Sequence, residues 1–281
     1  YQTFAVSGEE IEWDIEFFNR SRHAVNILDM CLTVPIGAID ESVQACQNLN
    51  RHFSLNGNSS FLYWIPYTGQ GDILLMSMKK GTAMEYATWD GKYYLHATNV
   101  VDRANDTWRI PSTSKTVAPY QRYLTGFNFT VAKDHTDLRG KLYDKGNVLV
   151  KVAPGMVVTP EMEVYCALQT QLPVEQLTVE HPGQIKVTNI GKTKDNKHIY
   201  KFRFSRLGEN LITVNYGNGQ MCYLDFFVTE PLETLIKKRA RFIVDKQQHR
   251  DSTKWYNGLY SLWDMKKAEL LSPDYLGELR E

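Results

Sequence analysis

The sequence predicts a mainly β protein, built from a large two-sheet unit, a smaller immunoglobulin-like β-sandwich and a short C-terminal helical segment. Apolar and polar residues alternate through most of the first 230 positions, which is typical of strands with one buried face. Glycine, asparagine and aspartate separate these runs at short intervals, as in antiparallel sheets joined by turns. Near Pro231 the apolar period changes from two residues to 3.6, so a helix should follow the sheets.

Residues 1–145 are expected to form the large unit. The clearest strand runs from Ile11 to Phe17, with apolar residues on one face and Glu12, Asp14 and Glu16 on the other. These acids could hold a metal or work as an acid/base pair, but a solvated outer face explains them better. Further strands are expected over 24–34, 60–65, 73–78, 83–88, 93–97 and 123–131. A segment over 104–119, rich in serine, threonine and proline, is predicted to be a surface connection that touches another domain or a ligand.

Residues 146–230 are expected to form the immunoglobulin-like unit, because seven short apolar runs fit into about 80 residues. The predicted strands cover 148–152, 162–168, 176–179, 185–189, 200–204, 211–216 and 221–228. Cys166 and Cys222 both fall on the apolar face of their strands. A disulfide between them is possible, but two buried free thiols are the more ordinary interpretation.

Residues 231–281 are expected to begin with an amphipathic helix. Apolar positions recur every three or four residues from Leu232 to Val244, and Pro231 suits a first helical turn. The helix should end near residues 249–252. Its apolar stripe requires a cover, supplied either by the second sandwich or by further helices beyond this chain.

The composition argues against several classes of function. Lysine plus arginine and aspartate plus glutamate number 32 each, so nucleic acid and anionic membranes are not expected partners. No apolar run approaches the roughly 20 residues of a membrane span. The cysteines and histidines form no CxxC, HxH or HExxH pattern, so no metal and no cofactor are expected. A GxSxG elbow and phosphate-binding glycine loops are also absent, and no catalytic residue is assigned.

Two aromatic groups are candidate substrate-binding sites, because flat rings can stack on sugars. Tyr63, Trp64 and Tyr67 precede a glycine-rich loop, although a core anchored by Trp64 with two tyrosines at its rim is the simpler interpretation. The aromatic residues Trp89, Tyr93, Tyr94 and Trp108 pose the same choice between core and ligand contact. Near the C-terminus, Trp255, Tyr256 and Asp264 could contact a sugar or simply pack the helices against the sandwich.

Several motifs of the chain resemble those of a known family. They are the runs at 63–69 (YWIPYTG), 152–156 (VAPGM), 206–210 (RLGEN), 226–231 (FFVTEP) and 239–248 (RARFIVDKQQ). They are similar to segments of secreted proteins of the six-hairpin glycosidase type. In that family a β-supersandwich and an immunoglobulin-like module precede an (α/α)6 toroid, which carries catalysis. The resemblance implies a supersandwich over 1–145, an immunoglobulin-like module over 146–230 and the start of a toroid over 231–281.

The resemblance implies a function for the parent protein rather than for these residues alone. The chain is expected to be the non-catalytic N-terminal portion of a glycoside hydrolase that acts on a poly- or oligosaccharide, with the missing toroid as its partner. A polysaccharide lyase with the same toroid, or a glycan-binding or adhesion module, are the alternatives. A secreted, periplasmic or cell-surface location is expected, since the chain lacks an initiator methionine and carries N-x-S/T sequons at Asn19, Asn58, Asn105 and Asn128.

Overall fold

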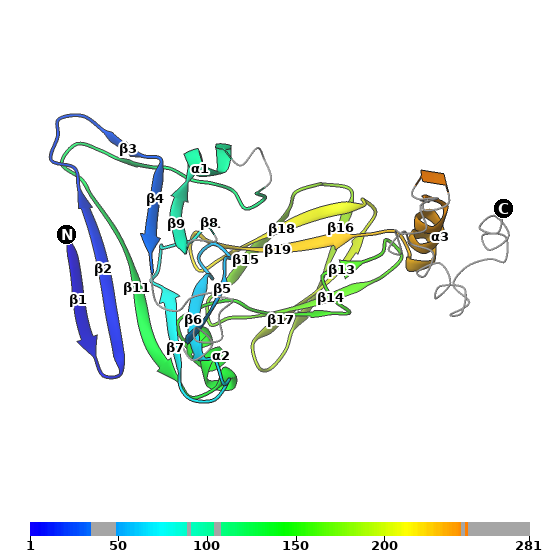
Figure 1. Cartoon of the computed structure of the whole chain (residues 1–281), viewed down its shortest axis with the longest axis horizontal. Helices are drawn as coiled ribbons and strands as arrows, with labels where there is room; N and C mark the ends of the chain where they lie inside the picture. The colour runs from blue at the N-terminus through cyan, green and yellow to red at the C-terminus, as the bar shows by residue number, and fades with distance from the viewer. Residues whose placement is uncertain (35–48, 89–90, 104–107, 243–244, 247–281) are drawn as a thin grey trace, which may run out of the picture.

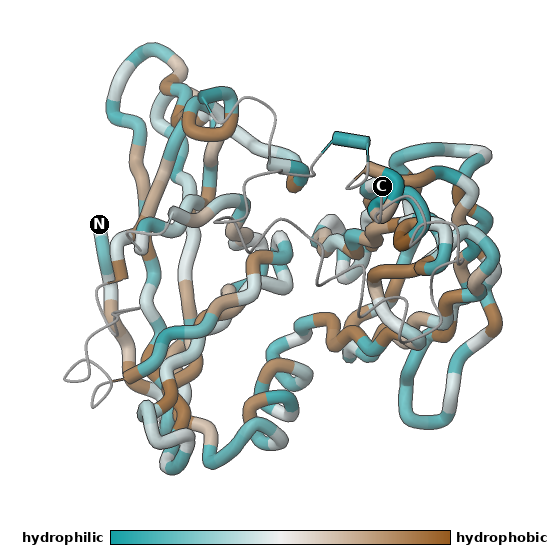
Figure 2. The backbone as a smooth tube through the Cα atoms, turned by 45° about the vertical axis from the view of Figure 1, so that its right-hand side comes forward, coloured by the Kyte–Doolittle hydropathy of each residue, from teal (hydrophilic) through white to brown (hydrophobic). Residues whose placement is uncertain are grey.

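The computed structural model describes residues 1–34, 49–88, 91–103, 108–242 and 245–246. Most of these residues lie in antiparallel sheets, which confirms the predicted mainly β class. Figure 1 shows two β units side by side, with a helix at the far end of the second. In Figure 2 the strands of both units alternate between hydrophilic and hydrophobic segments, the pattern from which the sheets were predicted.

The first unit packs a curved six-stranded sheet against a smaller three-stranded sheet. The large sheet has the order β1 (Gln2–Ser7), β2 (Glu10–Phe18), β11 (Arg122–Ala132), β7 (Ile73–Met78), β6 (Phe61–Pro66) and β5 (Leu49–Ser54). The small sheet has the order β4 (Asp29–Thr33), β9 (Lys92–Ala97) and β8 (Tyr86–Ala87), and β3 (Val25–Ile27) pairs with β10 (Lys115–Val117). Trp64, Phe127 and Tyr93, from both sheets, are fully buried between them.

The second unit is a sandwich of two four-stranded sheets. One has the order β12 (Leu149–Ala153), β14 (Val164–Gln169), β17 (Lys197–Phe204) and β16 (Ile185–Lys192). The other has the order β13 (Val157–Val158), β19 (Gln220–Val228), β18 (Gly208–Tyr216) and β15 (Val174–Val179). Phe202, Phe204 and Phe226 meet in its core. Cys166 and Cys222 are free thiols in the same core, and burial raises the pKa of each to about 12.

Three helices complete the described residues: α1 (Thr98–Arg103), α2 (His135–Asp144) and α3 (Leu232–Phe242). The Asp134 side chain caps α2 by accepting from two backbone N–H groups, which fixes where the helix begins. In α3, Ile236 and Ala240 are buried whereas Leu232 remains exposed. The predicted end of this helix lies outside the described residues. None of the described helices combines the length and the apolar composition that crossing a membrane requires.

Most predicted strands are present, with differences that have physical causes. The run over 24–34 is two strands rather than one, since β3 pairs with β10 and β4 pairs with β9. Strands β1 and β5 and helix α2 were not predicted. β1 is an edge strand with every residue exposed, and α2 buries only Leu138 and Leu142, so neither carries a strong apolar period. The division into three domains stays a prediction.

A tight turn of the first unit, residues 56–59, docks on the edge of β19 and fixes the two units to each other. β13 pairs only with the last part of β19, which leaves the start of β19 open. There the backbone N–H of Asn58 donates to the carbonyl of Met221 at 2.9 Å, and the Met221 N–H donates to Asn58 Oδ1 at 2.8 Å. The Tyr223 N–H donates to Asn56 Oδ1 at 2.5 Å. We call residues 56–59 the docking turn.

Ser59 extends this contact to the start of the second unit. Its Oγ accepts from the backbone N–H of Val148 at 2.7 Å, and its carbonyl accepts from the Asn147 side chain at 3.1 Å. Ser59 is 3% exposed and Asn147 4% exposed, so these bonds lie in the protein interior. The docking turn thus satisfies polar groups that would otherwise be buried without partners.

We predict that Gly57→Ala destabilises the protein more than Gly69→Ala does. Both glycines have positive φ, +58° and +70°, so each alanine costs about 1–2 kcal/mol of backbone strain. A Cβ on Gly57 would also lie 2.5 Å from the carbonyl oxygen of Met221, whereas one on Gly69 would meet nothing within 4 Å. Urea unfolding of the two variants measures the difference. Equal losses of unfolding free energy would show that the close approach at Gly57 is unimportant.

Candidate functional site

A groove between the two β units is the candidate site. It consists of two cavities of about 480 and 440 Å³, which share Ser54, Asn56, Met156 and Tyr223 as lining residues. We call the larger one the α2 cavity, because α2 forms one wall, and the smaller one the Trp108 cavity. Both lie beside the docking turn, so the contact that joins the units also shapes the groove. Their volumes fall in the range of small-ligand sites.

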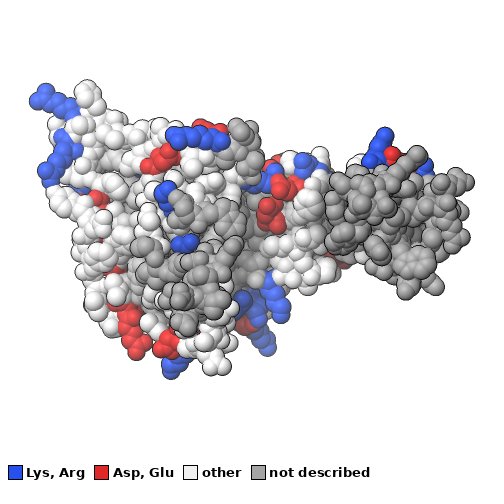
Figure 3. Space-filling model, viewed as in Figure 1, with Lys and Arg blue, Asp and Glu red and all other residues white. Residues whose placement is uncertain are grey.

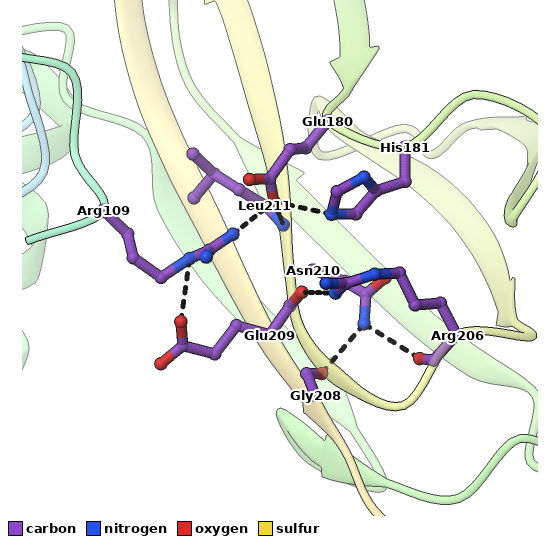
Figure 4. A network of polar contacts seen from close by, with 8 residues as sticks. All are labelled: Arg109, Glu180, His181, Arg206, Gly208, Glu209, Asn210 and Leu211. Atoms are coloured by element: carbon purple, nitrogen blue, oxygen red, sulfur yellow. Dashed lines mark hydrogen bonds and ion pairs between the residues drawn. The ribbon is translucent and has the colours of Figure 1, made fainter. Parts of the chain in front are cut away.

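Arg109 lines the Trp108 cavity and reaches from the first unit to the second (Figure 4). The guanidinium forms ion pairs with Glu180 and, at 3.0 Å, with Glu209. Glu180 also accepts from the backbone N–H of Leu211 at 3.1 Å, so β18 helps to orient the carboxylate. This contact accords with the expectation that the segment over 104–119 touches another domain, as far as the described residues show.

The lining of this cavity is acidic overall. Glu209 and Asp225 line it, and Glu180 pairs with Arg109 at its edge, so three carboxylates face one guanidinium. Desolvation raises the pKa of the Asp225 carboxyl, and Glu209 and Glu180 add to this, while Arg109 lowers it. Carboxylates with spare lone pairs can accept hydrogen bonds from ligand hydroxyls. On the face seen in Figure 3 acidic and basic side chains are interspersed, without one dominant sign.

An aromatic cluster adjoins the same cavity. The Trp108 ring contacts Tyr86 edge-on at 4.9 Å between centroids, and Tyr86 contacts Tyr94 in the same manner at 5.8 Å. All three side chains are half-buried, and they lie on the outer face of the three-stranded sheet. The Trp108 indole N–H donates to the carbonyl of Glu85 at 2.5 Å, which fixes the plane of its ring. The cavity therefore combines a fixed apolar ring with carboxylates.

A buried chain of hydrogen bonds supports the segment that carries Trp108 and Arg109. Glu85 is 5% exposed and accepts from both the hydroxyl and the backbone N–H of Thr113, the latter at 2.8 Å. The Thr113 hydroxyl uses its hydrogen on Glu85, so at its contact with His96 Nδ1, 2.8 Å long, it must accept. His96 therefore carries its hydrogen on Nδ1, and its Nε2 accepts from the Tyr123 hydroxyl at 2.9 Å. Burial lowers the pKa of His96, which favours the neutral ring that this chain needs.

The α2 cavity has the opposite electrostatic character. His135 and Arg139 line it from successive turns of α2, and none of the described residues that line it is acidic. Tyr63 forms part of the opposite wall, where it stacks on His52 at 4.8 Å and meets His135 edge-on at 5.7 Å. Partial burial raises the pKa of the Tyr63 hydroxyl.

The residues proposed from sequence are distributed unevenly with respect to this groove. Tyr63 lines the α2 cavity. Trp64 is 0% exposed in the core of the first unit, and Tyr67 is 54% exposed after β6 but lines neither cavity. Trp255, Tyr256 and Asp264 lie outside the described residues, as does Trp89. Alternation along β6 explains the split between Tyr63 and Trp64, because neighbouring residues of a strand face opposite ways.

The acidic residues on the outer face of β2 form ion pairs. Lys79 bridges Glu12 and Asp14 at 2.7 Å each, and Arg122 pairs with Glu16, so these acids are neutralised on the outer surface. Within the described residues no cluster of three or more histidines, cysteines and acids could hold a metal.

Three of the four sequon asparagines lie in the described part of the chain, and none presents a free amide. Asn19 is 8% exposed and donates to the carbonyls of His23 and Val117. Asn128 is also 8% exposed, and Asn58 belongs to the docking turn. Glycan attachment at these three positions would disrupt contacts of the folded protein, so these three sequons do not support secretion.

Comparison with known proteins places the chain in a family. Residues 72–272 match the profile of DUF5695, a family of unknown function, and since this is more than half of the chain, the protein belongs to that family. No curated protein matches the sequence. A solved structure of a polysaccharide lyase matches with a TM-score of 0.70 at 17% identity, over 92% of this chain and 38% of the lyase chain. That likeness shows a shared fold, and the protein spans well under half the length of the lyase.

We predict that Glu85 lowers the stability of the protein as the pH rises. Burial raises the pKa of its carboxyl from 4.5 to about 7, so between these values the folded state binds more protons than the unfolded state. The unfolding free energy should fall across this window, by up to about 3 kcal/mol, and level off above it. Glu85→Gln, which keeps an acceptor for Thr113, should remove this dependence, as urea unfolding at pH 5 and pH 8 would measure. The exposed Glu161→Gln serves as control, and an unchanged slope in Glu85→Gln would contradict the assignment.

Proposed function

We propose that the chain is a non-catalytic portion of a carbohydrate-active enzyme and that its groove binds part of a poly- or oligosaccharide. The observation that carries this proposal is the Trp108 cavity, where a fixed indole ring stands beside Glu209 and Asp225. Sugars present apolar C–H faces and hydroxyl donors, and these two kinds of group match such a wall. The shared fold with a polysaccharide lyase supports the same class of substrate.

In this proposal the chain supports a helical toroid of the same polypeptide, which carries catalysis. The resemblance to six-hairpin glycosidases supports this arrangement, and so does α3, which leaves Leu232 and Phe242 exposed after the second sandwich. The groove would then extend the substrate cleft of the enzyme. A location outside the cytoplasm follows from a polysaccharide substrate, which is too large to enter a cell intact.

A polysaccharide lyase is the second candidate for the parent enzyme, beside the glycoside hydrolase. A lyase needs a tyrosine or histidine base and a group that neutralises the carboxylate of a uronate. Tyr63, His135 and Arg139 supply these residue types around one cavity. The fold of the lyase structure favours the same candidate.

We predict that Trp108→Ala weakens glycan binding by at least about tenfold, because a lost aromatic contact is worth about 1.5 kcal/mol. Titration calorimetry with oligosaccharides identified on a glycan array would measure the loss, and circular dichroism would confirm that the variant is folded. Tyr67→Ala is the comparison, since Tyr67 is exposed but lines neither cavity. A loss of binding in Tyr67→Ala alone would move the site from the groove to the loop after β6.

The lyase candidate has a separate test. β-Elimination leaves an unsaturated sugar that absorbs ultraviolet light, so a lyase releases absorbing products from a uronate polysaccharide and a hydrolase does not. If the α2 cavity is catalytic, Tyr63→Phe should abolish that signal, since it removes only the hydroxyl, while the melting temperature stays within a few degrees. Full activity in Tyr63→Phe would assign catalysis elsewhere.

A further inference from the structure

We propose that the α2 cavity is a subsite for an acidic sugar and that Arg139 binds its carboxylate. This inference rests on the proposed function and adds the chemical class of the glycan. It places the charged sugar at one end of the groove and an uncharged sugar at the other, where Trp108 and the carboxylates lie.

The first argument is that the polar groups of Arg139, His135 and Tyr63 in this cavity have no partner among the described residues. In the part of the chain that the structure describes, the Arg139 guanidinium has no hydrogen bond or ion pair, and neither the His135 ring nitrogens nor the Tyr63 hydroxyl has a hydrogen-bond partner. By contrast, Arg109 at the other end of the groove forms ion pairs with Glu180 and Glu209. Among the described residues that line the two cavities, Arg139 is therefore the guanidinium without a carboxylate partner.

The second argument is that the acids nearest to Arg139 are occupied elsewhere. Asp134 accepts from the backbone N–H groups of Thr136 and Asp137 at 2.8 Å each. Asp137 accepts from the Lys133 N–H at 2.9 Å and lies 3.9 Å from Lys141. Neither acid lines the cavity.

The third argument is geometric. A guanidinium presents two parallel N–H donors that match both oxygens of a carboxylate, and His135 stands one turn away on the same wall. Tyr63, which stacks on His52 and meets His135 edge-on, offers a hydroxyl that can donate to the sugar oxygens. Phe61 and Leu142 add apolar side chains to the lining of the cavity.

The test compares acidic and neutral forms of the same sugars. Fragments of polygalacturonate, alginate and heparosan are titrated into the full chain, each beside its carboxyl-reduced form. We expect at least one acidic fragment to bind about tenfold more tightly than its reduced form, with Arg139→Gln removing that preference. Arg203→Gln is the matched control, because Arg203 is exposed on β17 and lines neither cavity.

The outcomes separate this inference from the proposed function. If the reduced fragments bind as well as the acidic ones and Arg139→Gln binds like the wild type, the acidic subsite is wrong while glycan binding stands. If Arg203→Gln weakens binding as much as Arg139→Gln, general charge attraction explains the preference and the subsite is again wrong. If neither the acidic fragments nor neutral array glycans bind, the glycan-binding groove itself is refuted. Tyr63→Phe should weaken the acidic form less than Arg139→Gln does, because it removes an uncharged donor.

Discussion

The docking turn is the contact on which the rest of the described structure depends. A strand edge with unpaired N–H and C=O groups must be covered or solvated, and β19 is open where β13 does not reach. The backbone and side chain of Asn58 satisfy Met221 in the manner of a short added strand, and Asn56 does the same for Tyr223. The two sandwiches are thereby locked through directional bonds, which fix orientation more strictly than apolar contact would.

The groove is a consequence of this lock. Its walls come from β5, β6, the segment before β10 and α2 of the first unit and from β19 of the second, which the docking turn joins. Arg109 makes a second polar contact between the units, in the Trp108 cavity, where this one side chain of the first unit pairs with Glu180 and Glu209 of the second.

Much of the fold was predictable because burial imposes a period on the sequence. β14 and β19 alternate between buried and more exposed residues, and Pro231 marks the start of α3 as expected. The groove was harder to predict. Trp108 and Arg109 follow no period, and nothing local distinguishes Arg139 from an ordinary surface charge. The Asp134 cap with Leu138 and Leu142 one turn apart was the available signal for α2. Tyr63 was identified as a candidate, but its partners His52 and His135 are separated from it in sequence.

The opposite charges at the two ends of the groove constrain which ligands can bind there. Glu209 and Asp225 line the Trp108 cavity, and Glu180 pairs with its Arg109, so a polymer with an acid on every unit would be repelled there even if Arg139 attracted it. Attraction in one cavity and repulsion in the other would favour a glycan whose acidic and neutral sugars alternate, or a glycan that is charged at one end only. The same asymmetry would set the direction of a bound glycan, since the reverse orientation would put its carboxylate beside those of the protein. Specificity in such a groove arises as much from the unfavourable end as from the favourable one.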